Sequence, residues 1–325
     1  MNRPRRQFLR LIAGAAALSA SSRTTRAQTY PSRPVRWVVG FAPGGGNDIV
    51  ARLMGQWLSE RTGQPFIIEN RPGGGTNIAT EAVVNAPPDG YTFLLAGLPN
   101  ASNASLFGKL NFNFIRDITP AAGIIRIPNV IVVNPSVPVK TVPEFIAYAK
   151  ANPGKINMAS AGSASAGHLA GELFKMMADV NLVHVPYRGN GPALSDLLGG
   201  QVEVLFASLP SSIEYIKAGK LRGIAMTSAK RSDALPELPT IGEYVPGYEM
   251  SAWFGVGVPK GTPAEVIDKI NKEINAGLAD PKMKGRFTDL GGIAIGGSPA
   301  DFGALIADET AKWVKVIRAA NIKAD

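Results

Sequence analysis

Three consecutive glycines, Gly44–Gly46, separate a short apolar run from a stripe of apolar residues at helical spacing. The run, Val38 and Val39, is typical of a buried strand, and the stripe from Ile49 to Leu58 is typical of a helix. A helix N-terminus presents unpaired N–H groups and the positive end of its dipole, and glycines let a ligand approach the backbone closely. The loop therefore predicts a binding site for an anion.

The glycine loop does not match the two common nucleotide motifs. A phosphate loop needs a lysine after its last glycine, whereas Gly46 is followed by Asn47 and Asp48. A dinucleotide fingerprint fails as well, because Ile49 stands where the third glycine belongs. A negative Asp48 would repel a phosphate, and Asn47 and Asp48 could instead act only as helix caps. The kind of anion is left open by these residues.

The order strand, small-residue loop, helix returns several times along the chain. Such units are typical of an α/β fold with parallel strands, whose following loops open on one edge of the sheet. We expect these loops to provide several walls of one site. The units are expected at residues 65–86, 155–178, 182–200 and 202–219, with a late strand and helix at 249–278 and a final amphipathic helix at 299–320.

The chain also divides into two series of such units. A fresh strand-helix series begins near residue 130, and Pro259, Gly261 and Pro263 punctuate a later return. We predict lobe 1 from residues 28–129 plus 250–325 and lobe 2 from residues 130–249, joined by two crossing strands. A single larger sheet is the alternative.

The first residues have the pattern of a bacterial export signal. An arginine pair, Arg5-Arg6, precedes the apolar stretch Leu11–Ala20, and Thr25–Ala27 has the pattern of a cleavage site. The pair predicts a twin-arginine signal over residues 1–27 and a periplasmic location. The stretch is too short to span a bilayer, and we expect no stable membrane insertion.

Charge and composition exclude several classes of function. Residues 1–27 hold six of the 34 basic residues and no acid, so the rest carries 28 basic against 25 acidic residues, a net charge of +3 instead of +9. No basic run is interleaved with aromatic residues, so we expect no nucleic-acid partner. The chain has no cysteine and two histidines, which argues against disulfides and a structural zinc site. No cofactor and no metal ion are expected.

Several long blocks resemble the Bug family, the extracytoplasmic solute receptors of tripartite tricarboxylate transporters. The resemblance covers essentially the whole mature chain and implies a two-lobed periplasmic-binding-protein (Venus flytrap) fold, each lobe a mixed, mostly parallel sheet flanked by helices. It also implies capture of a small carboxylate by cleft closure and delivery to two integral-membrane subunits. The blocks are "YPSRPVRWVVGFAPGGGNDIVARLM", "IENRPGGGTNIATEAV", "PPDGYTFLL", "PYRGNGPALSDLLGGQVEVLF" and "FGVGVPKGTPAEVIDKIN".

The resemblance assigns the first half of the site to the glycine loop. It implies that backbone N–H groups and bridging waters hold a ligand carboxylate there, and that Phe41 packs on the carbon skeleton of the ligand. An ordinary core role is the alternative for Phe41. The matching residues are Phe41, Ala42, Pro43, Gly44 and Gly45.

The second half falls on "MASAGSASAGHLAGEL", which matches the second binding loop of the family. Hydroxyl and helix N–H groups there again suit an anion. The serines could instead be helix caps, and the histidine could only support the loop. The candidates are Ser160, Gly162, Ser163, Ser165 and His168.

Two further strand ends align with segments that line the pocket in the family, at Arg188-Gly189 and Ala207-Ser208. Arg188 is the only cation near these loops and could contact the ligand, directly or through water, or form a salt bridge that supports the hinge. Many relatives have an acid where this chain has Ala207-Ser208. The loss of that acid disfavours an amino-acid ligand, whose ammonium group needs a partner.

In the first lobe, Gly97, Asn100 and Ser102 follow a predicted strand and complete the expected site. Leu98 and Pro99 stand where many relatives have Ser or Thr, which indicates a more apolar wall.

An exported hydrolase is the main alternative class. It would need a Gly-x-Ser-x-Gly elbow with a distant histidine and acid, and the segments around Ser160 and Ser165 each match only half of it. A receptor that feeds a sensor kinase is a second alternative. We expect no enzymatic activity, and nothing in the sequence argues against a monomer.

Overall fold

The computed structural model describes residues 30–319 and 321–323. From Arg33 onward the chain forms one compact unit. Its strands form a mixed sheet in the order β2-β1-β3-β9-β4-β7-β5-β6, with β8 and β10 also paired to β4. The predicted signal at residues 1–27 lies outside the described residues.

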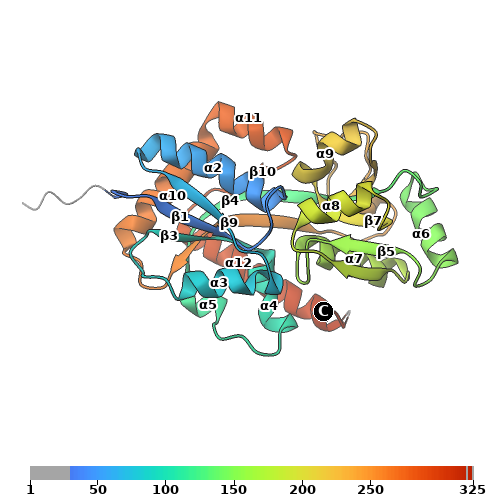
Figure 1. The fold of residues 1–325 in the computed structure, drawn as a ribbon, viewed down its shortest axis with the longest axis horizontal. Coiled ribbons are helices and arrows are strands. Elements are labelled where there is room, and N and C mark those ends of the chain that lie inside the picture. Colours follow the sequence, from blue (N-terminus) through green and yellow to red (C-terminus); the bar gives the residue numbers. More distant parts are fainter. Residues whose placement is uncertain (1–29, 320, 324–325) are drawn as a thin grey trace, which may run out of the picture. The chain divides into compact units, whose positions relative to one another are not determined.

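The first part of the chain supplies one end of the sheet, where β1 pairs in parallel with both β2 and β3. Helices follow these strands as the apolar patterns predict, and the unit expected at residues 65–86 is confirmed. In Figure 1, α2 lies on one side of these strands and α3 and α4 lie on the other. The elements are β1 (Val35–Val39), α2 (Gly46–Thr62), β2 (Phe66–Asn70), η1 (Gly74–Thr76), α3 (Asn77–Val84), β3 (Thr92–Gly97), α4 (Leu98–Leu106) and α5 (Phe114–Asp117).

Two long strands, β4 (Ile118–Val133) and β9 (Ser251–Pro259), run antiparallel through the centre. The first part of β4 pairs with β9 up to Pro128, and from Asn129 onward β4 pairs with β7. β4 also pairs with β8 and β10. The change of partner falls at the predicted lobe boundary. The division into two lobes itself stays a prediction.

The middle of the chain supplies the other end of the sheet, where β5 pairs in parallel with β6 and β7. The units expected at residues 155–178, 182–200 and 202–219 are confirmed. Figure 1 shows α7 on one side of these strands and α8 and α9 on the other. The elements are α6 (Val142–Ala151), β5 (Asn157–Ser160), α7 (Ala166–Ala178), β6 (Val183–Pro186), α8 (Asn190–Leu198), β7 (Val204–Ser208), α9 (Leu209–Lys217), β8 (Arg222–Met226) and η2 (Ile241–Glu243).

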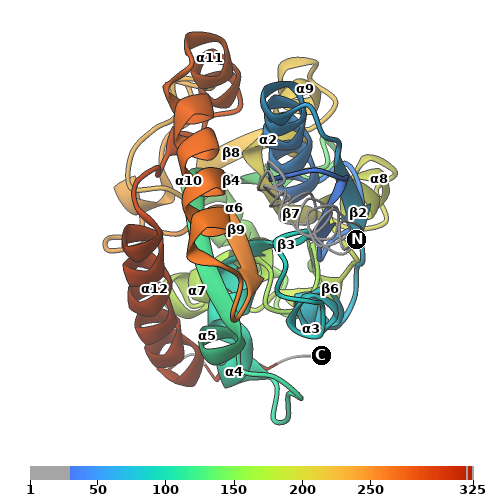
Figure 2. The same cartoon turned by 90° about the vertical axis from the view of Figure 1, so that its left-hand side faces the viewer.

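The C-terminal helices pack against the end of the sheet that the first part of the chain supplies. Figure 2 shows α10 and α12 lying along β4. The indole N–H of Trp57 in α2 donates to the carbonyl of Glu273 in α10 at 3.0 Å. This hydrogen bond joins α2 to α10 on one face of the sheet. The remaining elements are α10 (Ala264–Ala279), α11 (Pro281–Asp289), β10 (Ile293–Ala294) and α12 (Pro299–Ala319), so the predicted last helix is confirmed.

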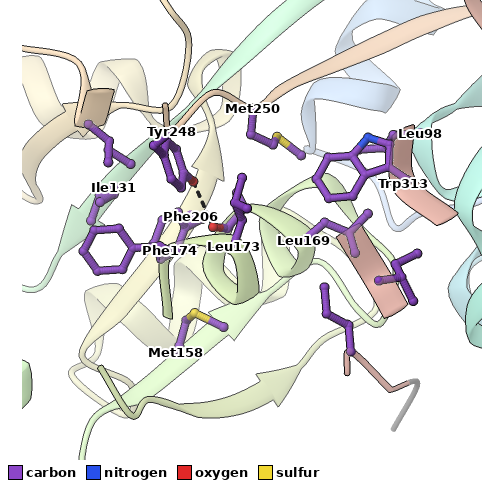
Figure 3. Packing of buried hydrophobic residues seen from close by; sticks show 14 of the residues in the cluster. Leu98, Ile131, Met158, Leu169, Leu173, Phe174, Phe206, Tyr248, Met250 and Trp313 are labelled. Atoms are coloured by element: carbon purple, nitrogen blue, oxygen red, sulfur yellow. Dashed lines mark hydrogen bonds between the residues drawn. The ribbon is translucent and has the colours of Figure 1, made fainter. Parts of the chain in front are cut away.

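A large hydrophobic cluster connects the two ends of the sheet. Figure 3 shows Leu98 and Trp313 close to Leu169 of α7, and the same cluster continues to Phe174 and Phe206. The phenol of the fully buried Tyr248 donates to the carbonyl of Ala170 at 2.8 Å. Among the described residues, no helix is long and apolar enough to cross a membrane.

Candidate functional site

Five helices begin at one small cavity, which we call the inner cavity. These helices, α2, α4, α7, α8 and α9, each follow the carboxyl end of a strand. About 20 Å³ of the cavity admits the centre of a water-sized sphere, which is room for only one or two water-sized groups. Its lining residues are Phe41, Asn47, Leu98, Pro99, Asn129, Ala161, Ser165, Ala166, Gly167, Asn190, Ser208, Ala252 and Phe254.

This convergence creates a positive potential without a buried cation. Each helix N-terminus contributes unpaired N–H groups and a partial positive charge. The side chains of Asn47, Ser165, Asn190 and Ser208, from α2, α7, α8 and α9, line the same cavity. The arrangement can hold an anionic group by hydrogen bonds and helix dipoles.

Three buried polar atoms of the lining have no hydrogen-bond partner within the described residues. They are Oδ1 of Asn129, Oδ1 of Asn190 and Oγ of Ser208. The amide of Asn129 is oriented by its Nδ2, which donates to the carbonyl of Phe206 at 2.9 Å. Burial of an unpaired polar atom is costly, so these atoms mark the cavity as a place where a polar ligand or a water completes the hydrogen bonding.

The side chain of Asp48 holds the glycine loop in place and does not cap α2. The N-cap of α2 is Gly45, and no side chain caps this helix, so the capping alternative for Asn47 and Asp48 is wrong. Asp48 accepts the N–H of Gly44 at 3.1 Å, a bond from Arg52 at 2.9 Å and one from Asn70 at 3.0 Å. Burial alone would raise the pKa of Asp48, but these hydrogen bonds together lower it. Asp48 is therefore an ionised support of the loop, paired with Arg52.

Loops far apart in the sequence meet at the cavity. The N–H of Ala42 donates to the carbonyl of Arg188 at 2.8 Å. A Cβ added at Gly189 would lie 3.0 Å from the nitrogen of Ala42, and one added at Gly191 would lie 2.8 Å from the carbonyl oxygen of Pro43. The predicted first loop and the loop that begins α8 therefore pack backbone against backbone.

The serine-rich loop divides into lining and supporting residues. Ser165 lines the inner cavity and is the N-cap of α7, accepting the N–H of His168 at 3.2 Å. Ser160 is fully buried, lies 2.6 Å from Nε2 of His184 and accepts the N–H of Gly162 at 3.0 Å. Gly162 and Ser163 line a larger pocket beside the inner cavity, together with Phe41 and Arg188.

The side chain of His168 supports this loop from behind. Its Nδ1 accepts the N–H of Ala164 at 3.1 Å, and its ring stacks on that of His184 with centroids 3.9 Å apart. Burial, followed by the nearby charges of His184 and Lys175, lowers the pKa of His168 from 6.5 to about 3. His168 is therefore neutral at ordinary pH. The geometry favours the supporting role that the sequence left as an alternative.

The structure does not bring several other predicted residues to the cavity lining. The N–H of Gly97 donates to Oδ1 of Asn100 at 2.8 Å, and Nδ2 of Asn100 donates to Thr80 at 2.8 Å. Ser102 is buried and donates to the carbonyl of Pro99 at 3.3 Å. Ala207 packs in a hydrophobic cluster with residues of β4 and α9. A direct role for these residues in binding stays a prediction.

Sequence reasoning missed part of the lining. Asn129, Asn190, Ala252 and Phe254 line the inner cavity, but none was a candidate. Asn190 directly follows the predicted Arg188-Gly189 pair and begins a helix, which was an available signal. Asn129 stands inside the apolar run "IIRIPNVIVV", where a lone polar residue could have been noticed.

Among the described residues, no group of three or more His, Asp or Glu side chains could hold a metal ion.

Comparisons with known proteins agree with this architecture. The sequence pattern of the tripartite tricarboxylate transporter family receptor matches residues 50–322. The chain is 35% identical over 300 residues to BugT of Bordetella pertussis, covering 91% of this chain and 92% of BugT.

Two solved structures are similar throughout. An R. palustris protein solved with adipate has a TM-score of 0.89 and 39% identity, covering 91% of this chain and 100% of that one. MatC of Rhodopseudomonas palustris, solved with bound malate, has a TM-score of 0.85 and 31% identity, covering 89% and 100%. The chain is therefore a solute receptor and not an enzyme, and it belongs to the receptor family of the tripartite tricarboxylate transporters that its motifs predicted.

Proposed function

We propose that this protein is a periplasmic receptor that holds a carboxylate group of a small organic acid in the inner cavity and delivers the acid to the membrane subunits of a tripartite transporter. The observation that carries the proposal is the convergence of five helix N-termini on buried, unpaired Asn and Ser atoms. The two similar structures that hold adipate and malate support a carboxylate as the ligand.

The chemistry of the lining supports an anion held mainly by neutral donors. A carboxylate can accept several N–H and O–H bonds, and charge-assisted bonds of this kind are stronger than neutral ones. The hydroxyl of Ser208 is one unpaired donor. The fixed acceptor, Oδ1 of Asn129, suits a bridging water or a hydroxyl group of the ligand.

The positions of the two loops support capture of the ligand between them. Residues 42–46 lie against residues 188–191 and against Ser208, so donors from distant parts of the chain act together only when these loops are close. A ligand that contacts both sides stabilises this closed arrangement over an open one. The change of pairing in β4 after Pro128 supports a hinge in the crossing strands.

The first test is calorimetric titration of residues 28–325, freed of ligand by unfolding and refolding, with adipate, malate, citrate, benzoate and glucose. We expect binding of at least one acid and none of glucose. At a ligand concentration a hundredfold above Kd, the free energy of unfolding should rise by about 2.7 kcal/mol. A response to glucose alone, with silence across the acids, would contradict the proposal.

A matched pair of variants tests the site itself. Ser208→Ala removes an unpaired hydroxyl of the cavity, whereas Ser212→Ala removes a buried hydroxyl of the same helix that donates to the carbonyl of Ser208 at 3.2 Å. We expect Ser208→Ala to weaken acid binding about tenfold and Ser212→Ala to leave it within about twofold. Equal effects of the two variants would remove Ser208 from the site.

A further inference from the structure

A separate pocket lies beside α4, and none of its lining residues lines the inner cavity. This α4 pocket is lined by residues of α4 and α5, by the segment between these helices, by Asn77 of α3 and by Thr310 of α12. Figure 1 shows α4 and α5 next to each other. The volume of the α4 pocket is about 520 Å³, within the range of about 300–1,000 Å³ that is usual for sites of small molecules.

The walls of the α4 pocket are mainly apolar and carry no unpaired charge. The apolar side chains with more than one carbon are Phe107, Leu110, Phe112, Phe114 and Ile115. Arg116 is the one charged residue of the lining, and its guanidinium donates to both carboxylate oxygens of Asp117 at 2.6 and 2.7 Å. Aromatic rings pack favourably on one another. The lining therefore suits a neutral aromatic molecule better than an ion.

One buried acceptor of the α4 pocket has no partner within the described residues. Asn103 is 2% exposed, and its Oδ1 is unpaired. The orientation of this amide is fixed, because Nδ2 donates to the carbonyl of Gly75 at 2.6 Å and to Oδ1 of Asn77 at 2.7 Å. A buried acceptor without a partner is costly. The group that completes the hydrogen bonding must therefore be an N–H or O–H donor.

The α4 pocket is connected to the serine-rich loop through Gly75, whose carbonyl accepts the amide of Asn103. A Cβ added at Gly75 would lie 3.0 Å from Cζ of Phe107 on one side and 2.9 Å from the carbonyl oxygen of Ser163 on the other. Thr76 beside it has a φ of +77°, which a β-branched residue keeps only where the surrounding structure holds it. The contacts of Gly75 with Asn103 and Phe107 help to hold this turn against the serine-rich loop.

We infer that the α4 pocket binds a neutral aromatic molecule with one N–H or O–H donor, of the indole or phenol type, which raises the affinity of the receptor for its acid. The donor bonds Oδ1 of Asn103, and the ring packs on Phe107. Because both residues contact Gly75, the bound molecule stabilises the closed arrangement of the loops. The binding site does not depend on the proposed function, whereas the effect on acid affinity rests on it.

Indole and 1-methylindole test the site, because the two molecules differ in the single N–H donor. Residues 28–325 are titrated with each molecule in the absence of acids and followed by amide NMR spectra. Indole should shift the signals of Gly75 and of residues 103–107. A hydrogen bond to a neutral group changes affinity about threefold to tenfold, so 1-methylindole should bind more weakly by that factor. Equal affinities would overturn the assignment of Asn103.

Ala104→Trp and Ser105→Trp are a matched pair of variants on α4. Ala104 is exposed and lines the α4 pocket, whereas Ser105 follows it on the helix and does not line the pocket. Ala104→Trp should fill the pocket and weaken indole binding about tenfold or more. Ser105→Trp should leave it within about twofold. Undiminished indole binding by an Ala104→Trp protein that unfolds in urea like the wild type would overturn the site.

The coupling is tested with the acid that binds most tightly in the first calorimetric titration. Its affinity should rise about fivefold in saturating indole, and by linkage indole should gain the same factor in saturating acid. If indole binds and the acid affinity does not change, the effect on the receptor is wrong and carboxylate capture stands. If no acid binds the wild type, the proposed function fails together with this effect, and the acid-free indole titration still decides the binding site.

Discussion

The side chain of His168 supports the loop that carries Ser165 from behind. It accepts the N–H of Ala164 and stacks on His184, while its Nε2 lies 3.9 Å from Oε1 of Glu172, which itself pairs with Lys175. The loop that carries Ser165 is thus fixed by a neutral imidazole. Protonation of the ring would remove the Nδ1 acceptor.

This arrangement predicts a pH-dependent stability. Below pH 6.5 the unfolded chain binds a proton at His168 that the folded chain, with its pKa of about 3, does not bind. The free energy of unfolding should therefore fall as the pH is lowered from about 6.5 toward 3, by up to about 1.4 kcal/mol per pH unit. Above pH 6.5 this contribution to the pH dependence disappears.

Urea unfolding of the wild type and of His168→Asn between pH 7.5 and 4 checks the prediction. Asparagine keeps an acceptor near the position of Nδ1 but does not titrate. The variant should show a flatter dependence on pH, and parallel curves for the two proteins would contradict the assignment to His168.

The connection between β1 and α2 shows how one element is positioned by polar contacts. Asp48 ties the glycine loop to its own helix through Gly44 and to β2 through Asn70, and Asn70 also donates to the carbonyl of Phe41 at 2.9 Å. The side chain of Asp48 is 5% exposed. The loop conformation is therefore held by hydrogen bonds within the protein.

Removal of this support should affect both folding and binding. Asp48→Ala leaves the N–H of Gly44 without its acceptor and removes one of the two acceptors of the Asn70 amide, which costs about 1–3 kcal/mol of unfolding free energy. Acid binding should weaken as well. Asp301→Ala is the control, because within the described part of the chain Asp301 accepts bonds only from Ser298 at the start of α12, far along the sequence. Urea unfolding and titration of both variants provide the measurement, and an Asp48→Ala protein with wild-type values would contradict the role.

In the whole molecule, loops that follow strands at the two ends of the sheet meet at the inner cavity. Gly191 lies so close to the carbonyl of Pro43 that there is no space for a side chain at this position. Residues 42–46 and 188–191 are separated by more than 140 residues in the sequence, so this contact joins distant parts of the chain and is not a local turn.

Gly191→Ala should therefore hinder closure. Overpacking against a backbone oxygen costs about 1–3 kcal/mol, so acid affinity should fall about tenfold. Gly199→Ala, at the other end of α8, meets atoms no closer than 3.5 Å and should bind normally. Small-angle X-ray scattering should show ligand-induced compaction in the wild type and in Gly199→Ala, and a smaller one in Gly191→Ala. Full compaction of Gly191→Ala would show that this contact does not limit closure.

The local patterns of the sequence were sufficient to predict the helices and strands and the receptor family. The strand expected at Val38 and Val39, the four βα units and the last helix agree with the structure, because hydrophobic periodicity and helix-starting residues act over short distances. The resemblance to the receptor family singled out Phe41, Ser165, Arg188 and Ser208. In the structure Phe41, Ser165 and Ser208 line the inner cavity, and Arg188 lines the pocket beside it.

Tertiary structure alone decided which polar groups remain unpaired. The sequence does not show which asparagine keeps an unpaired oxygen. Asn100 has partners on both sides of its amide, whereas Oδ1 of Asn129 has none within the described residues. The strained, buried Thr76 was invisible for the same reason. Hydrogen-bond satisfaction depends on what packs against a group from distant parts of the chain, and no local pattern records those neighbours.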